Sequence, residues 1–295
     1  MRATDNVRCP VCGRPVATDG RTLYCVGGER RHSFDVASSG YVNLLPPGRG
    51  KNARTGDDKA MISSRTRFLD KGYYSRISGH IGSIISSIAE NAGRREIYFA
   101  DCASGEGYHT CNIIKTVAEN GIVPYAAAFD ASKYGADRGA KRAAAQGLKE
   151  AFFAAANIFS LPLADGCCDF ALSIFAPIAW DEMRRILKDD GRLVVASSGE
   201  RHLFELREAL YDEPREASGV VRVPDGFAPE TEETVGYKVT VEGNEAVTDL
   251  FFMTPFCYKT SRRDTEKLSR IDRLEVTVEV KISVFSKTNR KEDVK

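Results

Sequence analysis

The sequence predicts an α/β protein in which helices cover both faces of a mainly parallel sheet, with a small metal-binding module in front of it. Three observations predict this architecture. Apolar strand segments alternate with helical segments between residues 97 and 197, as in βαβ units. Residues 274–285 alternate between apolar and polar over a long span, which indicates an antiparallel strand. Residues with metal-ligand chemistry gather before residue 33.

The metal-binding module is predicted from Cys9, Cys12, Cys25 and His32. The first two form a Cys-x-x-Cys turn, which presents two thiolates from one tight loop. Zinc prefers four such ligands arranged as a tetrahedron. We therefore expect Zn²⁺ on these four residues, in a zinc-binding module that covers residues 1–36 and contains short strands.

The N-terminal region is basic although the whole chain is not. Residues 1–56 carry nine arginines and lysines against four acidic residues, a net charge of +5, while the 295 residues together carry +1. Such a region is typical of a surface that binds a polyanion. A solvated surface around a metal site explains the same charge equally well.

A linker and one large domain are predicted after the module. Residues 37–56 are rich in glycine and proline and are predicted to be the linker, although the apolar segment 41–45 should pack onto another element. Residues 57–295 are predicted to form the large domain. It begins with helices at 57–69 and 74–90, the second with isoleucines along one stripe.

The alternating part of the large domain follows in order along the chain. Its strands are expected at 97–102, 125–129, 152–156, 170–175 and 193–197. The helices between them are expected at 108–119, 133–145 and 180–187. After residue 200 we expect helices at 202–211, 244–252 and 262–270, and strands at 232–241 and 274–285.

A glycine-bearing turn between the first strand and the next helix predicts a nucleotide-type site. Small residues let the backbone approach a ligand, and the helix N-terminus offers free N–H groups. Asp130 ends the second strand, where a carboxylate can accept both hydroxyls of a ribose. Asn157 and Ile158 follow the third strand and could contact an adenine. The candidate contacts in the turn itself are Asp101, Ala103, Gly105, Glu106, Gly107 and Tyr108.

The charge of this turn favours one ligand class over another. A dinucleotide site expects Gly-x-Gly-x-x-Gly with a pyrophosphate lying on the helix, whereas this chain has an Ala-x-Gly-x-Gly pattern from Ala103 to Gly107. Glu106 would repel phosphates but could accept a hydrogen bond from an amino group. S-adenosylmethionine (SAM) carries an amino group, a sulfonium and no phosphate. The pattern therefore favours SAM over NAD.

The composition indicates the compartment in which the protein works. Three of the eight cysteines belong to the metal module, and the others are scattered among apolar residues, which fits a reducing compartment better than a disulfide framework. No apolar run approaches the roughly 20 residues needed to span a bilayer. The start of the chain lacks the apolar core of a signal peptide. We therefore expect a cytoplasmic protein without a membrane partner.

Several segments together carry a family resemblance. The opening has Cys9-Pro10-x-Cys12, then His32-x-Phe34-Asp35, then Gly-Tyr-Val-Asn-Leu-Leu-Pro at 40–46. Further matching segments are Gly56-Asp57, Met61, Arg65, Arg67–Leu69, Gly72-x-Tyr74, Gly105–Tyr108, Asp130-x-Ser132-Lys133, Phe175–Pro177, Arg201–Leu203, Glu205-Leu206 and Met253–Phe256. They span nearly the whole chain and resemble the 23S rRNA (guanine-N1)-methyltransferases. The metal-binding opening joined to residues 40–46 is specific to that family, whereas the donor turn is shared by very many methyltransferases.

The resemblance implies a class I SAM-dependent methyltransferase (Rossmann-like) sheet with a small N-terminal zinc-binding domain. It implies SAM as the donor and N1 of a specific guanine in a hairpin of 23S rRNA as the target. It also implies a homodimer that holds the RNA in a cleft containing the zinc domains. The chain departs from the family in two places. Six residues separate Cys25 from His32 where three are usual, and Ala103-Ser104 stand where glycine and a small residue are usual.

Two residues are candidates for the chemistry on guanine. N1 of neutral guanine carries a proton, so a base should remove it before or during methyl transfer. His202 follows the fifth strand and could be this base, cap its helix or meet an RNA phosphate. Phe175 could stack on a flipped guanine or belong to the core. The arginines expected to meet RNA phosphates are Arg8, Arg14, Arg30 and Arg31.

Two other functions stay open on the residues alone. The first is a SAM-dependent methyltransferase acting on a small molecule, with a purely structural zinc site. The second is a non-catalytic zinc-containing RNA-binding protein with a degenerate nucleotide fold. The altered Ala103-Ser104 turn allows this second function, whereas the intact Asp130 and Asn157 argue against it.

Overall fold

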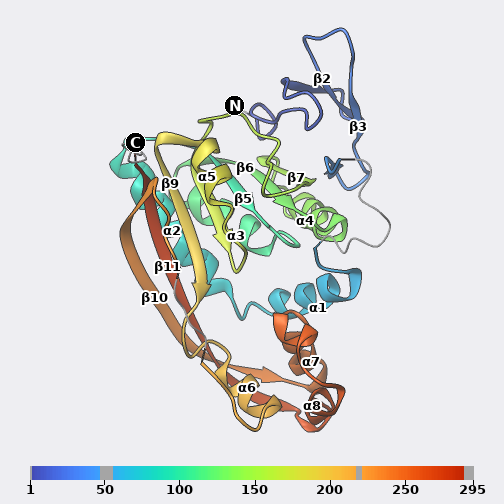
Figure 1. Ribbon diagram of the computed structural model, residues 1–295, viewed down its shortest axis with the longest axis vertical. Helices are drawn as coiled ribbons and strands as arrows, with labels where there is room; N and C mark the ends of the chain where they lie inside the picture. Colours follow the sequence, from blue (N-terminus) through green and yellow to red (C-terminus); the bar gives the residue numbers. More distant parts are fainter. Residues whose placement is uncertain (1, 47–55, 217–220, 289–295) are drawn as a thin grey trace, which may run out of the picture.

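An eight-stranded mixed sheet forms the centre of the computed structural model, which describes residues 2–46, 56–216 and 221–288. The strands are β4 (Val42–Asn43), β5 (Glu96–Cys102), β6 (Val123–Asp130), β7 (Ala151–Ala155), β8 (Cys168–Ile174), β9 (Leu187–Ser198), β10 (Phe227–Glu242) and β11 (Arg273–Lys287). Their order across the sheet is β10-β11-β9-β8-β5-β6-β7-β4 (Figure 1). Each strand predicted for the large domain is present.

The helices predicted from the sequence are also present. They are α1 (Lys59–Asp70), α2 (Ser75–Asn91), α3 (Tyr108–Glu119), α4 (Lys133–Ala145), α5 (Trp180–Ile186), α6 (Phe204–Leu210), α7 (Asn244–Phe252) and α8 (Arg262–Lys267). Two short 3₁₀ turns, η1 (Pro255–Tyr258) and η2 (Leu268–Arg270), lie on either side of α8. Within the described residues, no helix is long and apolar enough to cross a membrane.

The connections of the sheet create a switch point beside β5. The strands from β4 to β9 pair in parallel, whereas β11 pairs antiparallel with both β9 and β10. The chain runs from β5 outward through β6 and β7, and then returns to β8 on the other side of β5. Open α/β sheets bind ligands beyond the carboxyl ends of their strands at such a reversal.

Apolar residues cover both faces of the central strands. Along β5, Ile97 and Phe99 belong to one buried cluster, while Tyr98 and Ala100 belong to the other. This alternation follows from the two-residue period of a strand. A strand buried on both faces must be apolar throughout, which is why the segment reads as a continuous apolar run.

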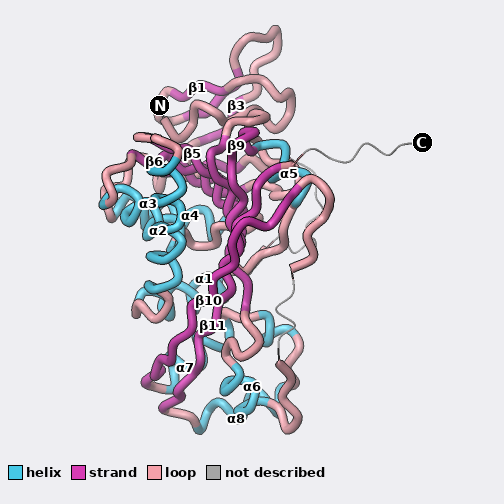
Figure 2. Tube along the Cα trace, turned by 90° about the vertical axis from the view of Figure 1, so that its left-hand side faces the viewer, coloured by secondary structure: helices cyan, strands magenta, loops and turns pink. Residues whose placement is uncertain are grey.

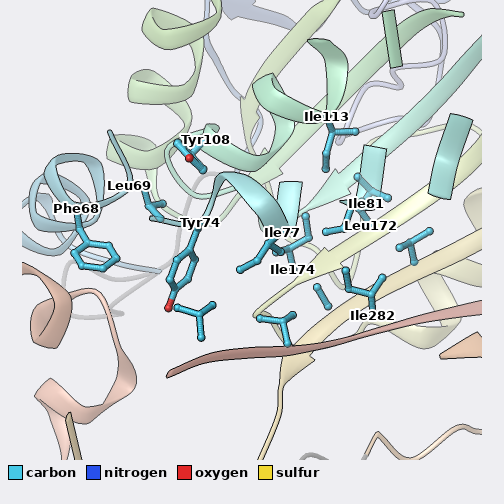
Figure 3. Close-up of a cluster of buried hydrophobic side chains, with 14 of the residues drawn as sticks. Phe68, Leu69, Tyr74, Ile77, Ile81, Tyr108, Ile113, Leu172, Ile174 and Ile282 are labelled. Atoms are coloured by element: carbon cyan, nitrogen blue, oxygen red, sulfur yellow. The ribbon is translucent and has the colours of Figure 1, made fainter. Parts of the chain in front are cut away.

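The predicted isoleucine stripe of α2 packs onto the first of these faces. Ile77 and Ile81 are fully buried and lie near Leu172 and Ile174 of β8 and Ile282 of β11 (Figure 3). Each such side chain stabilises the fold by about 1.5–3 kcal/mol relative to an exposed one. This packing holds the carboxyl end of β8 in place.

The N-terminal module is a separate small sheet at one end of the molecule. Its strands β1 (Val16–Thr18), β2 (Thr22–Cys25) and β3 (Ser33–Asp35) pair antiparallel in that order. The short strands predicted there are confirmed. Figures 1 and 2 place the module at the end of the longest axis opposite α6 and α8.

The predicted linker contributes a strand to the large sheet. Val42 and Leu44 are buried, and β4 pairs in parallel with β7, so the apolar segment 41–45 does pack onto another element. The strand itself was not predicted, because two residues are too few to show a period. The remainder of the linker, residues 47–55, lies outside the described residues. The boundary drawn at residue 36 therefore stays a prediction.

The C-terminal part extends the sheet beyond the helical layers. The antiparallel pair β10 and β11 runs down the molecule toward α6, α7 and α8 (Figure 2). There, Arg67 of α1 donates from Nε to Oδ2 of Asp249 on α7 at 2.8 Å. This bond holds the C-terminal helices against α1, the helix that borders the cavity described next.

Candidate methyl-donor and acceptor site

A cavity of about 1060 Å³ opens beyond the carboxyl ends of the central strands. Of the residues predicted from the sequence, it is lined by Ala103, Gly105, Glu106, Asp130, Asn157, Ile158, Phe175 and His202. Residues from α1 and the segment from Met253 to Tyr258 close the opposite side. The cavity therefore lies at the switch point beside β5.

Close packing shapes the turn between β5 and α3. Gly107, the N-cap of α3, has φ of 78°. A Cβ placed there would lie 2.8 Å from Cα of Gly139 and 2.9 Å from the Phe153 ring. Both the positive φ and the lack of space for a side chain therefore require glycine at this position. This contact presses the start of α3 against α4 and directs the turn toward the cavity.

Asp130 ties the turn to the end of β6. Its Oδ2 accepts from the N–H of Gly105 at 2.8 Å, and its Oδ1 accepts from the N–H of Ser132 at 2.7 Å. Burial raises the pKa of Asp130, and the two backbone bonds oppose that rise. Because each carboxylate oxygen has a second lone pair, Asp130 can still accept from a ribose.

Three buried polar atoms of cavity-lining residues lack hydrogen-bond partners within the described residues. They are Ser104 Oγ, Glu106 Oε1 and Ser197 Oγ. Buried polar groups are almost always hydrogen-bonded in native proteins, so a polar ligand is the natural complement. Glu106 is 1% exposed, and its Oε1 forms an ion pair with Arg142 Nη2 at 3.7 Å, which is too long for a hydrogen bond. An amino-bearing, phosphate-free donor such as SAM fits this arrangement.

Three predicted contacts stand behind the turn and do not line the cavity. Asp101 is buried and accepts from Thr110 Oγ1, and burial raises its pKa to about 7. Gly107 packs against α4, and the ring of Tyr108 lies 5.5 Å from the Arg142 guanidinium. Direct contacts from Asp101, Gly107 and Tyr108 to the donor stay a prediction.

Backbone strain is concentrated on the cavity wall. Among the described residues, Ala103, Phe175 and Leu203 are the non-glycine residues with positive φ, at 76°, 53° and 53°. All three line the cavity. Such conformations cost about 1–3 kcal/mol each and persist only where the surroundings enforce them. Ala103, which stands where the family usually has glycine, thus adopts a conformation that favours glycine.

Phe175 follows β8, the strand next to β5, and its ring centroid lies 6.2 Å from that of His109 in the first turn of α3. Its side chain is 38% exposed, so it is not part of the packed core. Its ring is stacked on His202, with centroids 5.5 Å apart and an interplanar angle of 27°. An exposed aromatic face in a cavity is suited to stack on a base.

His202 is buried with both ring nitrogens in use. Its Nδ1 accepts from the N–H of Glu279 at 3.2 Å, so the proton of the neutral ring is on Nε2. That nitrogen lies 3.2 Å from the hydroxyl of Tyr74. Burial lowers the pKa of His202 to about 4. No lone pair is free for a proton from guanine, which argues against the predicted base role and favours a role in positioning Phe175.

Several lining residues escaped the site prediction. Arg65 forms an ion pair from Nη1 to Asp57 Oδ2 at 2.5 Å and donates from Nη2 to the carbonyl of Met253 at 3.3 Å. It thereby links the two sides of the cavity mouth. All three residues belong to segments that match the family, so the resemblance could have marked them as candidates for the site. His109 and Arg207 also line the cavity, and no pattern in the sequence marked them.

The predicted zinc ligands come together in the N-terminal module. The ligand atoms of Cys9, Cys12, Cys25 and His32 all lie within 4.8 Å of one another. His32 Nδ1 is 3.7 Å from Cys9 Sγ and 3.6 Å from Cys25 Sγ, close to the roughly 3.6 Å edge of a tetrahedral zinc site. The N–H of Arg14 helps lower the pKa of Cys12 to about 7, which favours the thiolate that zinc needs.

The longer loop before His32 does not disturb this site. The N–H of Cys25 donates to the carbonyl of His32 at 3.0 Å, and the N–H of His32 lies 3.1 Å from Cys25 Sγ. These bonds close the loop at its base, so the additional residues project away from the metal ligands. His32 therefore fits as the fourth ligand.

The fold and the two sites define a class I SAM-dependent methyltransferase that carries an N-terminal zinc ribbon. Family models agree with both parts. Residues 7–53 match the zinc ribbon described as "RlmA, N-terminal", and residues 95–246 match a methyltransferase domain.

The chain belongs to the family of 23S rRNA (guanine-N1)-methyltransferases. It is 34% identical to the 23S rRNA (guanine(748)-N(1))-methyltransferase of Streptomyces fradiae, over 74% of this chain and 70% of that protein. It is 29% identical to YxjB of Bacillus subtilis strain 168, named as a candidate 23S rRNA (guanine-N1)-methyltransferase, over 95% and 96% of the two chains. Among solved structures, YcgJ of Bacillus subtilis is similar with a TM-score of 0.45 and 14% identity, covering 72% of this chain and 99% of that one.

Proposed function

We propose that this protein transfers a methyl group from SAM to N1 of one guanine in a hairpin of 23S rRNA. The observation that carries the proposal is Phe175, a partly exposed aromatic ring on strained backbone that lines the cavity close to the donor turn. Its place on the cavity wall gives a flipped base a surface on which to stack. Family membership supports guanine N1 as the target atom.

The donor half of the cavity supplies binding and alignment. When bound there, SAM supplies a methyl group activated by the sulfonium charge. We propose that Asp130 accepts from the ribose, that Asn157 and Ile158 contact the adenine, and that Glu106 accepts from the amino group. Catalysis then depends largely on holding the acceptor nitrogen in line with the methyl group.

The zinc ribbon supplies affinity for RNA in this proposal. Arg14, Arg30 and Arg31 are exposed, and the guanidinium of Arg31 lies 3.5 Å from the centroid of the Tyr24 ring. Together with Arg8 they would contact phosphates, which give affinity and register but little sequence information. Arg49, Lys51 and Arg54 of the same basic region lie outside the described residues.

The assembly and location follow the family resemblance. We propose a homodimer in the cytoplasm, with the two zinc ribbons facing the same RNA. Equilibrium sedimentation of the purified protein tests the dimer. A monomer at concentrations where the enzyme is active would refute it.

Primer extension on 23S rRNA tests the proposed function. Incubation with the protein and SAM should create one new stop, because a methyl group on N1 blocks base pairing, and nucleoside mass spectrometry should identify 1-methylguanosine. Labelled SAM offered with a panel of small molecules tests the alternative substrate class. If label enters a small molecule and not the transcript, the RNA proposal is wrong. The absence of any heat on titrating SAM in a calorimeter would support the non-catalytic alternative.

A further inference from the structure

Arg207 of α6 is a buried cation on the wall of the cavity. The residue is 8% exposed and lines the cavity. Its Nη2 donates to the carbonyl of His202 at 3.0 Å, and its Nη1 donates to the carbonyl of Arg215 at 3.0 Å. Within the described residues, no carboxylate oxygen lies within 4.0 Å of its guanidinium. In the part of the chain that the structure describes, the charge is therefore held by two neutral carbonyls and has no carboxylate partner.

A buried cation without a counter-charge is costly. Burial of a charge is normally compensated by an ion pair or by several hydrogen bonds. Desolvation lowers the pKa of Arg207, and the nearby cation Arg201 lowers it further, whereas Tyr211 and Glu216 oppose the change. The fold keeps the charge in this place despite its cost, which points to a ligand that provides negative charge.

The position of Arg207 relates it to the proposed stacking surface. The carbonyl of His202 accepts from Arg207, while the ring of the same residue stacks on Phe175. The guanidinium also lies 5.3 Å from the centroid of the Phe256 ring. Phe175, Arg207 and Phe256 line one cavity, so the cation borders the space in which a base stacked on Phe175 would present an edge. The other titratable or charged groups that line the cavity are Asp57, Arg65, Tyr74, Glu106, His109, Asp130 and Tyr258.

We propose that Arg207 binds the O6 and N7 edge of the acceptor guanine, an inference that rests on the proposed function. A guanidinium donates to these two acceptors at once, and this leaves N1 free to face the donor half of the cavity. Adenine carries an amino donor in place of O6, so the same contact rejects adenine. Arg207 is then both a specificity-determining and a catalytic residue.

The catalytic contribution comes from charge on O6. When the N1–H bond breaks, the proton passes to water and the electron pair remains on the base, with negative charge shared between N1 and O6. A cation fixed at O6 stabilises that anion. N1 then forms a bond to the methyl carbon while the carbon–sulfur bond of the donor breaks, and its electron pair stays on sulfur as a neutral thioether. This route needs no histidine base, in agreement with the bonds that His202 already makes.

Single-turnover methylation of a synthetic hairpin tests the contact. The hairpin carries the guanine identified by primer extension, either unmodified or as 7-deazaguanine, which retains O6 and N1 but lacks the N7 acceptor. In the unmutated protein the deaza substitution should slow methylation by about 10-fold or more, because one charge-assisted hydrogen bond is lost. In Arg207→Met the rate on guanine should fall by about 100-fold. The hairpins with guanine and with 7-deazaguanine should then be methylated at nearly the same rate.

The comparison of the two hairpins is made within each variant, so a partly unfolded preparation does not change the ratio. Arg207→Lys keeps the charge and should recover part of the rate. Arg201→Met is the matched control, because Arg201 lies on the same segment with its guanidinium over Phe204, and it should keep the full deaza penalty. An equal deaza penalty in Arg207→Met and the unmutated protein would overturn the inference. So would a loss confined to RNA affinity, which would indicate a phosphate contact.

The outcomes separate this inference from the proposed function. If the unmutated protein fails to methylate any guanine in the rRNA, the proposed function is wrong. If it methylates the guanine but the deaza penalty survives in Arg207→Met, only the assignment of Arg207 is wrong.

Discussion

Gly107→Ala should destabilise the protein through two effects that a matched variant separates. A Cβ at Gly107 meets Gly139 Cα at 2.8 Å and Phe153 ring carbons at 2.9 Å, on backbone with φ of 78°. The left-handed conformation costs alanine about 1–2 kcal/mol, and overpacking adds about 1–3 kcal/mol. We therefore expect the free energy of unfolding to fall by about 2–5 kcal/mol. Gly121 has φ of 77° with no atom within 4 Å, so Gly121→Ala should lose only the conformational part.

Urea unfolding of the two variants measures the difference directly. The free energy of unfolding of Gly107→Ala should lie at least about 1 kcal/mol below that of Gly121→Ala. Calorimetric titration with SAM should also show weaker binding to Gly107→Ala, because the displaced turn carries Gly105 and Glu106. Equal free energies of unfolding for the two variants would show that α3 and α4 can move apart without loss of stability. Close packing at Gly107 would then not be what requires glycine there.

Three further predictions concern the zinc site, the RNA surface and the buried histidine. Cys12→Ser should lose bound zinc, measured by atomic emission, and most RNA affinity, while SAM binding survives in part; retention of zinc would refute the ligand assignment. Affinity for the hairpin should fall with salt at a log–log slope of about −3 if four arginines contact phosphates, and a flat response would exclude them. The pKa of His202 in the folded protein, about 4, lies below its unfolded value of about 6.5. Its contribution to the free energy of unfolding is therefore fully present above pH 6.5 and is lost as the pH falls toward 4. Between pH 7 and pH 5 this amounts to about 2 kcal/mol, and urea unfolding of His202→Gln should lack that part of the decline.

The attachment of the zinc ribbon bears on the zinc experiment. The N–H of Arg8 donates to the carbonyl of Pro162 at 2.8 Å, and Val7 forms a bridge with Leu163. Residues 162 and 163 follow closely after Asn157 and Ile158, the proposed adenine contacts. Loss of zinc can therefore perturb the donor half of the cavity through the loop that contains residues 162 and 163. For this reason we expect SAM binding in Cys12→Ser to survive in part and not in full.

Much of the fold was predictable because its signals are local. Strands buried on both faces, such as β5, read as apolar runs, and the isoleucine stripe of α2 has the helical period. The two-residue strand β4 carried no such signal. Its place at the sheet edge depends on Val42 and Leu44 finding β7, a contact between distant parts of the chain.

The site was predictable only where its residues share a motif. The donor turn, Asp130 and Asn157 each follow a strand, and parallel strands bring their carboxyl ends to one edge. The base role predicted for His202 rested on its place after β9 alone, and burial together with hydrogen bonds to Glu279 and Tyr74 argues against it. Arg207 lies on a short helix with no motif of its own, so its approach to the cavity could not be read from neighbouring residues.

By itself, the sequence determined the order of strands and helices, the four zinc ligands and the chemistry of the donor turn, because short-range periodicity and spacing encode all of these. Only the tertiary structure decided that Phe175 is exposed beside His202, that Ala103, Phe175 and Leu203 are strained around one cavity, and that the charge of Arg207 lacks a counter-ion among the residues the structure describes. Exposure, strain and the pairing of charges depend on which distant segments pack together, and that packing is settled by the whole chain at once.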